Sequence, residues 1–148
     1  MSQDFIAPPT DATGYLGAAQ GMLAGARPLL QVKYLPALAI THLCGHGCES
    51  VLKAILVCKG MTSDELSKKR FGHNILALWA EAEKREPRLP FPRPDWVGQL
   101  NQVHASPFQL RYPLGFHAIV LPNQSAMVQG IEELISLASS CIHGGSDA

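Results

Sequence analysis

Apolar residues recur at helical spacing along most of the chain and predict a series of amphipathic helices. The first apolar stripe predicts a helix from about residue 13 to residue 27. The second stripe is the broadest. It is delimited by Pro36, which suits a first helical turn, and by Gly60, which suits the position after a helix. A stripe of that breadth indicates a central helix that is buried on most sides.

Shorter segments of the same kind extend to the end of the chain. The capping-box sequence over residues 62–65 predicts a short helix. Further stripes predict helices over about 73–85, from 94 to about 104, and from 123 to about 144. No segment shows the alternating pattern of a strand, and no long repeat is present.

This pattern predicts an all-α fold with one domain. Helices of this length with mostly short connections favour an antiparallel bundle of about five helices over residues 13–145. A flexible N-terminal arm is expected over residues 1–12, where Pro8 and Pro9 form a stiff point. The length of 148 residues is sufficient for one hydrophobic core.

Three glycines recur every four residues along the first predicted helix, at Gly17, Gly21 and Gly25. Each costs roughly 1 kcal/mol relative to alanine in a helix interior. Such a ridge indicates the close approach of another backbone, with Ala37, Thr41 and Gly45 of the next helix as candidates to face it. The alternative is a weak, frayed helix.

The overall charge restricts what the domain can bind. Twelve Lys and Arg residues balance twelve Asp and Glu residues, so the formal net charge is zero. A protein that coats nucleic acid would be strongly basic, and a disordered tail would contain far fewer than the 47% hydrophobic residues found here. Any binding of phosphate must therefore come from a local patch.

The cysteines and the first residues bear on the cellular compartment. Cys44 and Cys48 lie one helical turn apart, where disulfide geometry is rarely met. The first residues lack the basic and apolar regions of a signal peptide, and no segment has the uncharged run of a membrane span. We therefore expect reduced thiols in a cytoplasmic protein without a membrane partner.

Two short clusters carry candidate binding chemistry. The basic run Lys68, Lys69 and Arg70 is able to hold a phosphate, although such a run is more often a solvated helix end. His42 and His46 lie one turn apart and have the spacing to share a metal ion. A closed zinc site needs two more ligands, and neither HExxH nor paired CxxC motifs are present. We therefore expect no metal site and no cofactor.

Arg111 and His117 form the one candidate catalytic pair. An arginine binds phosphate through two parallel hydrogen bonds, and a histidine transfers protons near neutral pH. Together they suit metal-independent attack of an RNA 2′-hydroxyl on its own phosphodiester. The alternative is an arginine that packs between helices and a histidine on the surface.

At this point the sequence resembles the HEPN family of helical domains, through three stretches. Residues 42–60 are similar to the family's long second helix, including the step from Glu49 to Lys53. Residues 72–78, Gly-His-Asn-Ile-Leu-Ala-Leu, resemble the Gly-His-Asp-Leu start of the next helix. The third stretch, Leu-Arg-Tyr-Pro over residues 110–113, precedes the final helix.

The resemblance spans roughly residues 12–143 and implies an up-and-down helical bundle that is often dimeric. Many members are toxins that cut RNA through an Arg-x4–6-His motif. Others bind nucleotides or RNA, or pair with nucleotidyltransferase-like antitoxins. Five residues separate Arg111 from His117, which lies within that spacing. However, Tyr112 replaces the polar residue that nuclease members usually have, and Pro113 interrupts the helix that presents the motif.

The resemblance also implies that four polar residues are structural: Glu49, Lys53, His73 and Asn74, of which Asn74 replaces the usual Asp. We expect His73, at the start of its helix, to hydrogen-bond toward the Glu49–Lys53 step. Loss of one partner would leave a buried polar group unpaired, at a cost of roughly 1–3 kcal/mol.

The leading expectation is a homodimeric, non-catalytic binding domain for a nucleotide, RNA or a partner protein. Its ligand-binding residues would be Arg111 and Tyr112, together with the basic run of residues 68–70. One alternative is a metal-independent ribonuclease of the toxin–antitoxin type, with Arg111 and His117 catalytic and a nucleotidyltransferase-like antitoxin as partner. The other is a scaffold for protein interaction.

Overall fold

The structure, a computed structural model, describes residues 9–105 and 120–144. Within these ranges the chain forms helices and no strand, so the predicted all-α class is confirmed. None of these helices is long and apolar enough to cross a membrane. The helices are α1 (Ala12–Leu29), α2 (Ala37–Cys58), α3 (Ser63–Leu66), α4 (Ile75–Arg85), α5 (Asp95–His104) and α7 (Gln124–His143).

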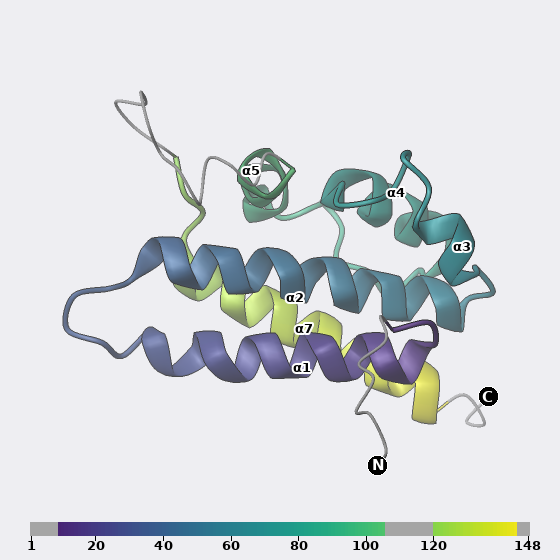
Figure 1. Cartoon of the computed structure of the whole chain (residues 1–148), viewed down its shortest axis with the longest axis horizontal. Coiled ribbons are helices and arrows are strands. Elements are labelled where there is room, and N and C mark those ends of the chain that lie inside the picture. Colours follow the sequence, from purple (N-terminus) through teal and green to yellow (C-terminus); the bar gives the residue numbers. More distant parts are fainter. Residues whose placement is uncertain (1–8, 106–119, 145–148) are drawn as a thin grey trace, which may run out of the picture.

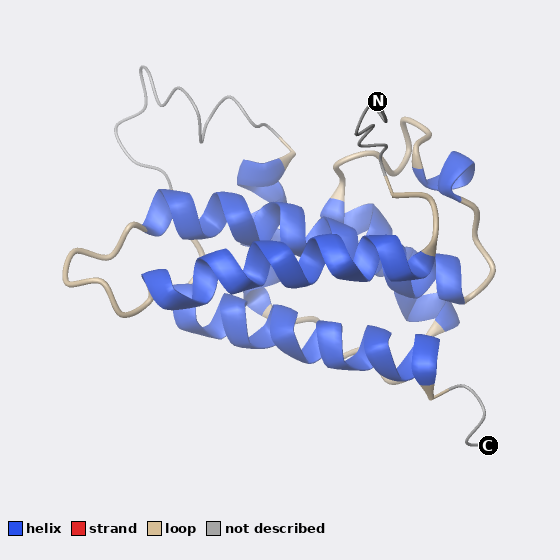
Figure 2. Ribbon diagram, turned by 60° about the horizontal axis from the view of Figure 1, so that its bottom comes forward, coloured by secondary structure: helices blue, strands red, loops and turns tan. Residues whose placement is uncertain are grey.

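Helix α2 lies at the centre of the fold and contacts each of the other helices named above. The three long helices lie side by side, with α1 antiparallel to α2 (Figure 1). Helix α7 contacts both and runs in the same direction as α2, so these neighbours do not alternate in direction. Helices α4 and α5 cover the side of α2 that α1 and α7 leave open (Figures 1 and 2). This position explains why the apolar stripe of α2 is so broad.

Polar side chains begin most of these helices, including the predicted cap at residues 62–65. The Asp11 carboxylate accepts a hydrogen bond from the backbone of Gly14 at 2.7 Å and starts α1. The predicted capping box of Thr62 and Glu65 forms at α3, with both reciprocal hydrogen bonds present. Asn74 plays the same part at α4, where its side chain accepts from the backbone of Ala77. Satisfying the free N–H groups of a first turn contributes about 1 kcal/mol to each helix.

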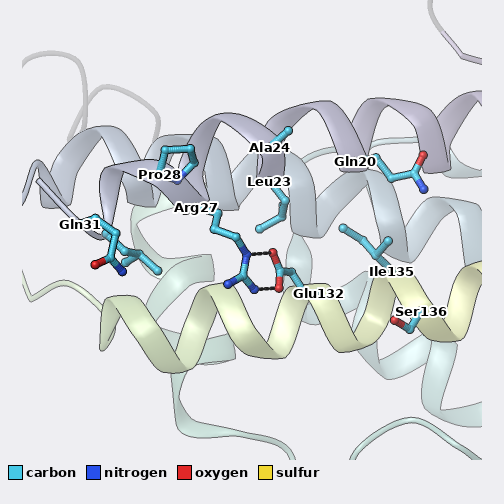
Figure 3. A pocket seen from close by; sticks show the side chains of 10 residues that line it. Gln20, Leu23, Ala24, Arg27, Pro28, Gln31, Glu132, Ile135 and Ser136 are labelled. Carbon is cyan, nitrogen blue, oxygen red and sulfur yellow. Dashed lines mark hydrogen bonds and ion pairs between the residues drawn. The ribbon is translucent and has the colours of Figure 1, made fainter.

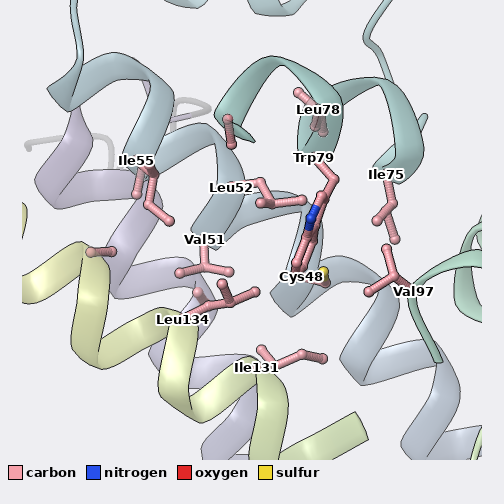
Figure 4. Packing of buried hydrophobic residues seen from close by; sticks show 14 of the residues in the cluster. Cys48, Val51, Leu52, Ile55, Ile75, Leu78, Trp79, Val97, Ile131 and Leu134 are labelled. Carbon is pink, nitrogen blue, oxygen red and sulfur yellow. The ribbon is translucent and has the colours of Figure 1, made fainter. Parts of the chain in front are cut away.

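The core is built around α2 and the aromatic side chains of α4 and α5. Trp79 of α4 reaches toward α2, beside Leu52 and Cys48 (Figure 4). Its ring meets that of Trp96 edge to face, with 6.0 Å between centroids. Trp96 lies against Gly130 of α7, where an added Cβ would stand 2.6 Å from the ring. Gly130 is therefore required for α5 to approach α7.

The prediction that another backbone closely approaches the glycine ridge of α1 is wrong within this chain. Gly17 and Gly21 are exposed, and a Cβ added at either would meet nothing within 4 Å. At Gly25 the nearest atom is a methyl carbon of Leu43, 3.6 Å away. The buried residues of α1 lie on the opposite side of the helix and pack into the core, so the glycine ridge lies on the outside.

The close contact between α1 and α2 occurs instead at Gly47. A Cβ there would lie 2.4 Å from a methyl carbon of Leu23 on α1. Of the three residues expected to face the ridge, Gly45 faces His104 of α5, and Thr41 accepts a hydrogen bond from Gln124 of α7 at 3.0 Å. The sequence predicted a close contact between α1 and α2, but it did not show which faces of the two helices meet.

A buried carboxylate fixes the proline-rich connection between α4 and α5. The side chain of Glu86 is fully buried, and it forms ion pairs with Arg88 at 2.8 Å and Lys59 at 3.0 Å. The thiol of Cys141 on α7 lies 3.4 Å away. The hydrogen bond from Arg88 is the main cause that holds the Glu86 pKa far below its usual 4.5. This contact joins the ends of α2, α4 and α7.

We predict that Glu86→Gln lowers the free energy of unfolding at neutral pH by about 2 kcal/mol, because charge-assisted hydrogen bonds are lost. The folded pKa is depressed, so the stabilisation is complete above the unfolded pKa of 4.5 and declines as pH falls below it. Denaturant unfolding from pH 7 to pH 3 should therefore give a flatter pH dependence in the variant. Glu133→Gln, at an exposed site on α7, should match the wild type; an equal loss in both variants would contradict the assignment.

A matched pair of glycine substitutions tests the packing of α1 and α7. Gly21→Ala should raise stability by about 0.5–1 kcal/mol, since the helix gains propensity and the Cβ meets nothing. Gly130→Ala gains the same propensity but should lower stability by about 1–3 kcal/mol, because the Cβ meets the ring of Trp96. Thermal unfolding measures both. Destabilisation by Gly21→Ala would mean that another surface covers this face of α1.

Candidate functional site

The most concentrated group of polar side chains surrounds Glu49, in the middle of α2. Its Oε1 lies 2.8 Å from Nδ1 of His73 and 2.9 Å from Nε2 of His104. Its Oε2 accepts a hydrogen bond from the ammonium of Lys53 at 3.1 Å. We call these four residues the Glu49 cluster. It joins α2, the segment before α4 and the end of α5.

Local backbone features place the two histidines. Gly72 has a φ of +44°, a left-handed conformation that favours glycine, and it turns the chain so that His73 precedes α4 beside α2. His104 is the last residue of α5 and packs against Gly45, where a Cβ would stand only 2.4 Å from its Nδ1. Only glycine at position 45 leaves room for this imidazole against the backbone of α2.

Burial makes the charge of Glu49 expensive unless it is paired. The residue is 9% exposed, and burial alone would raise the pKa of its carboxyl group. The hydrogen bond from His104, the charge of Lys53 and the hydrogen bond from His73 outweigh burial and lower the pKa to about 2. The carboxylate is therefore ionised at neutral pH, and its three partners keep it so.

Two further histidines of α2, His42 and His46, form a row of imidazoles that leads to His104. The rings of His42 and His46 meet edge to face at 4.7 Å between centroids, and His46 meets His104 in the same way at 5.1 Å. Burial, followed by the neighbouring His104 and His42, lowers the pKa of His46 below its usual 6.5. Burial thus favours the neutral form of His46 beside the cluster.

A cleft of about 410 Å³ opens beside Glu49 and Lys53. Five of its ten lining residues carry a hydroxyl group, and α1, α2 and α3 all contribute to the wall. The volume lies within the range of small-molecule sites. The cleft is lined by Pro9, Thr10, Tyr15, Ala18, Glu49, Ser50, Lys53, Ser63, Asp64 and Ser67.

A second hollow of about 700 Å³ lies between α1 and α7 (Figure 3). The ion pair of Arg27 and Glu132 crosses it, and the Arg27 side chain is 54% exposed. The charges in this hollow are paired with each other, as those of Lys53 and Glu49 are in the cleft, and they are more exposed to solvent. The lining residues are Gln20, Leu23, Ala24, Arg27, Pro28, Leu30, Gln31, Glu132, Ile135 and Ser136.

The structure brings three of the four predicted polar residues together. Glu49, Lys53 and His73 meet in the Glu49 cluster, whereas Asn74 caps α4 and takes no part in it. The side chain of His73 is 68% exposed, so it is not the buried hydrogen-bond partner that the sequence suggested.

The predicted ligand-binding residues lie elsewhere. Lys68, Lys69 and Arg70 are exposed between α3 and α4. The Arg70 guanidinium lies over the ring of Phe71 and 3.6 Å from the carboxylate of Glu81. The remaining predicted site residues, Arg111, Tyr112 and His117, fall outside the residues that the structure describes.

His104 is the functional candidate that the sequence analysis missed. The residue continues the apolar stripe of α5, together with Leu100 and Val103, and it is only 5% exposed. A histidine on a buried apolar stripe needs a polar partner, so the position of His104 in the sequence indicated a buried polar contact. Glu49, His73 and His104 are the only group in the described ranges whose metal-ligating atoms all lie within 4.8 Å of one another.

Comparison of the chain with protein-family models, curated proteins and solved structures finds no match. The function of the Glu49 cluster and its cleft must therefore be inferred from their own geometry and from the sequence motifs.

We predict unequal effects for the two histidines. His73→Ala should lower the free energy of unfolding by no more than about 1 kcal/mol, less than the sequence alone suggests. The reason is that His73 is exposed and Glu49 keeps two other partners. His104→Ala should cost about 2–4 kcal/mol, since a buried ring and a buried hydrogen bond are lost together. Chemical denaturation measures both; a larger loss for His73→Ala would invert this ranking.

Proposed function

We propose that the chain is a HEPN-like, non-catalytic binding domain that holds a nucleotide in the cleft beside Glu49 and Lys53. One observation carries the proposal: a cleft of nucleotide-like size, rich in hydroxyls, lies beside the polar step of the central helix. The basic run of residues 68–70 follows the cleft residue Ser67 directly along the chain.

The arrangement of α2 and α4 supports the family part of the proposal. The resemblance implies a long second helix whose Glu-x-x-x-Lys step meets the Gly-His start of the next long helix. In the structure, Glu49 and Lys53 lie one turn apart on α2, and His73 reaches Glu49 from the segment before α4. The parallel course of α2 and α7 is a feature that any assignment to the family must accommodate.

The cleft chemistry fits an uncharged sugar with phosphate at the rim. Hydroxyls of Ser50 and Ser63 are able to donate to oxygens of ribose or phosphate, whereas the hydroxyl of Ser67 already donates to the carbonyl of Asp64. Inside the cleft the Lys53 charge is already paired with Glu49, so a phosphate needs other cations. Lys68 and Lys69 are exposed and form no ion pair with any residue in 9–105 or 120–144, which leaves them able to attract an anion.

The absence of catalysis in this proposal rests on sequence and on thiol chemistry. Tyr112 and Pro113 depart from the pattern of the nuclease members, as noted above. Burial raises the pKa of the Cys44 thiol to about 12 and also raises that of Cys48, so neither is a thiolate nucleophile at neutral pH.

The proposal also includes a homodimer. Four large apolar side chains are exposed where α1 connects to α2, and they offer a surface for a second copy or another protein. These residues are Val32, Tyr34, Leu35 and Leu38.

A binding titration tests the nucleotide site. Fluorescent ATP and a short single-stranded RNA are titrated into the protein with a chelator present. The double variant Lys68→Glu/Lys69→Glu should bind at least about tenfold more weakly, since the exposed positive charges that follow the cleft residue Ser67 along the chain are reversed. The matched control Lys33→Glu/Lys84→Glu makes the same change in net charge at exposed lysines elsewhere, and it should bind like the wild type.

The other outcomes distinguish the alternatives. Equal weakening in both double variants would mean a non-specific charge effect and no site at the cleft. No binding by the wild type would favour the protein-interaction scaffold. Cleavage of the RNA under these metal-free conditions, lost in both Arg111→Ala and His117→Ala, would instead establish the ribonuclease. Light scattering on the same samples reports the mass of each variant, so that a change of oligomeric state is not mistaken for a change in the site.

A further inference from the structure

We propose that Glu49, His73 and His104 form a binding site for one divalent transition-metal ion, which goes beyond nucleotide binding. The donor set is two imidazoles and one carboxylate, each from a different part of the fold. Two histidines with one carboxylate are a ligand set that zinc and other transition metals use in proteins. The sequence analysis expected no metal because it considered only His42 and His46.

The donor atoms already converge on a single point. Nδ1 of His73 and Nε2 of His104 each approach the same oxygen, Oε1 of Glu49, at 2.8 and 2.9 Å. In a tetrahedral site with bonds near 2.0 Å, neighbouring ligand atoms stand roughly 3.3 Å apart. Each imidazole nitrogen therefore needs to move only about half an ångström from Oε1 to admit an ion, and the two nitrogens lie within 4.8 Å of each other. The exposed His73 side chain can make this movement without disturbing the core.

The partners of the ligands suit a metal site as well. Lys53 donates to Oε2 of Glu49, so Oε1 alone faces the histidines and the carboxylate would bind through one oxygen. Ligating carboxylates are commonly held in this way by a second hydrogen bond. The ring of His104 is fixed by its packing against Gly45, which presents Nε2 toward Glu49 without a search among rotamers. Two of the three ligands are thus preorganised.

Burial gives the site a closed side and an open side. His104 and Glu49 are 5% and 9% exposed, and they form the closed side. The side chain of His73 is 68% exposed, so an ion can enter from solvent past this ring. Three protein ligands leave the fourth tetrahedral position to water or to an oxygen of a bound molecule.

The surrounding charges also permit a cation. The carboxylate of Glu49 supplies a negative charge beside the two imidazoles. His46, the next imidazole of the row, meets the ring of His104 edge to face at 5.1 Å between centroids. Lys53 is the only lysine or arginine paired with Glu49 in the described ranges, and it faces the other carboxylate oxygen.

Metal titration of the full chain tests the proposal in the absence of nucleotide, so that it fails or succeeds independently of the proposed function. The purified protein is stripped with a chelator and then titrated with Zn²⁺ by calorimetry and with Co²⁺ by visible absorption. We expect one equivalent to bind, with the intense Co²⁺ absorption of a four-coordinate site. Zn²⁺ should also raise the melting temperature.

Variants of the ligands and matched histidine controls decide the outcome. His73→Ala and Glu49→Gln should each weaken Zn²⁺ binding by at least about tenfold. His143→Ala on α7 and His42→Ala should bind like the wild type. His73→Ala is the decisive variant, because this side chain is the exposed one of the three ligands and its removal should leave the protein folded. Unchanged affinity in His73→Ala, loss of binding in His42→Ala, or no saturable binding would each overturn the site and leave a hydrogen-bonded cluster alone.

Discussion

The buried charge of Glu49 is the constraint on which much of this fold depends. A carboxylate removed from water inside α2 costs several kcal/mol unless other groups replace its hydration. Here three partners do so, and only Lys53 comes from the same helix. His73 and His104 come from positions 24 and 55 residues away, so satisfying one side chain fixes the start of α4 and the end of α5 against α2. Gly45 follows from the same demand, since any larger residue would displace the imidazole of His104.

The helices were predictable because their signals are local. The stripe periods, the cap at Thr62 and the proline and glycine at the ends of α2 act within a few residues, and the structure has helices where they indicate. The breadth of the α2 stripe also identified the central helix. Which faces pair was harder, because a ridge such as Gly17 and Gly21 permits close approach without requiring it. The apolar stripe on the other face of α1 determined the packing instead.

The candidate site was predictable only in part, for the same physical reason. Glu49 and Lys53 share one helix, so their proximity follows from the spacing. The contact of His104 with Glu49 closes a loop of 55 residues, and nothing local specifies it. A polar residue on an apolar stripe shows that a partner is required but leaves its identity open. Convergence of residues from several elements is a property of the assembled fold.

One carboxylate connects the two proposed ligands. Glu49 lines the cleft and also provides the oxygen on which two histidines converge. Its two oxygens have different partners: Oε2 accepts a hydrogen bond from Lys53, and Oε1 faces the imidazoles. An ion on one oxygen and a nucleotide near the other would share a charged group, so their affinities would be thermodynamically linked.

The edge-to-face pair of Trp79 and Trp96 gives the protein a built-in optical reporter. These are the two tryptophans of the chain, and both lie in the half of the molecule formed by α4 and α5. Their ring centroids are 6.0 Å apart, and the angle between the ring planes is 88°. Trp96 also touches α7 at Gly130, whereas α1 contains no indole. Coupled indole transitions in near-ultraviolet circular dichroism would therefore follow the docking of α4 and α5 onto α2 and α7. Release of α1 alone would leave that spectrum largely unaltered, so partial unfolding of the bundle would be visible as a mismatch with the far-ultraviolet helical spectrum.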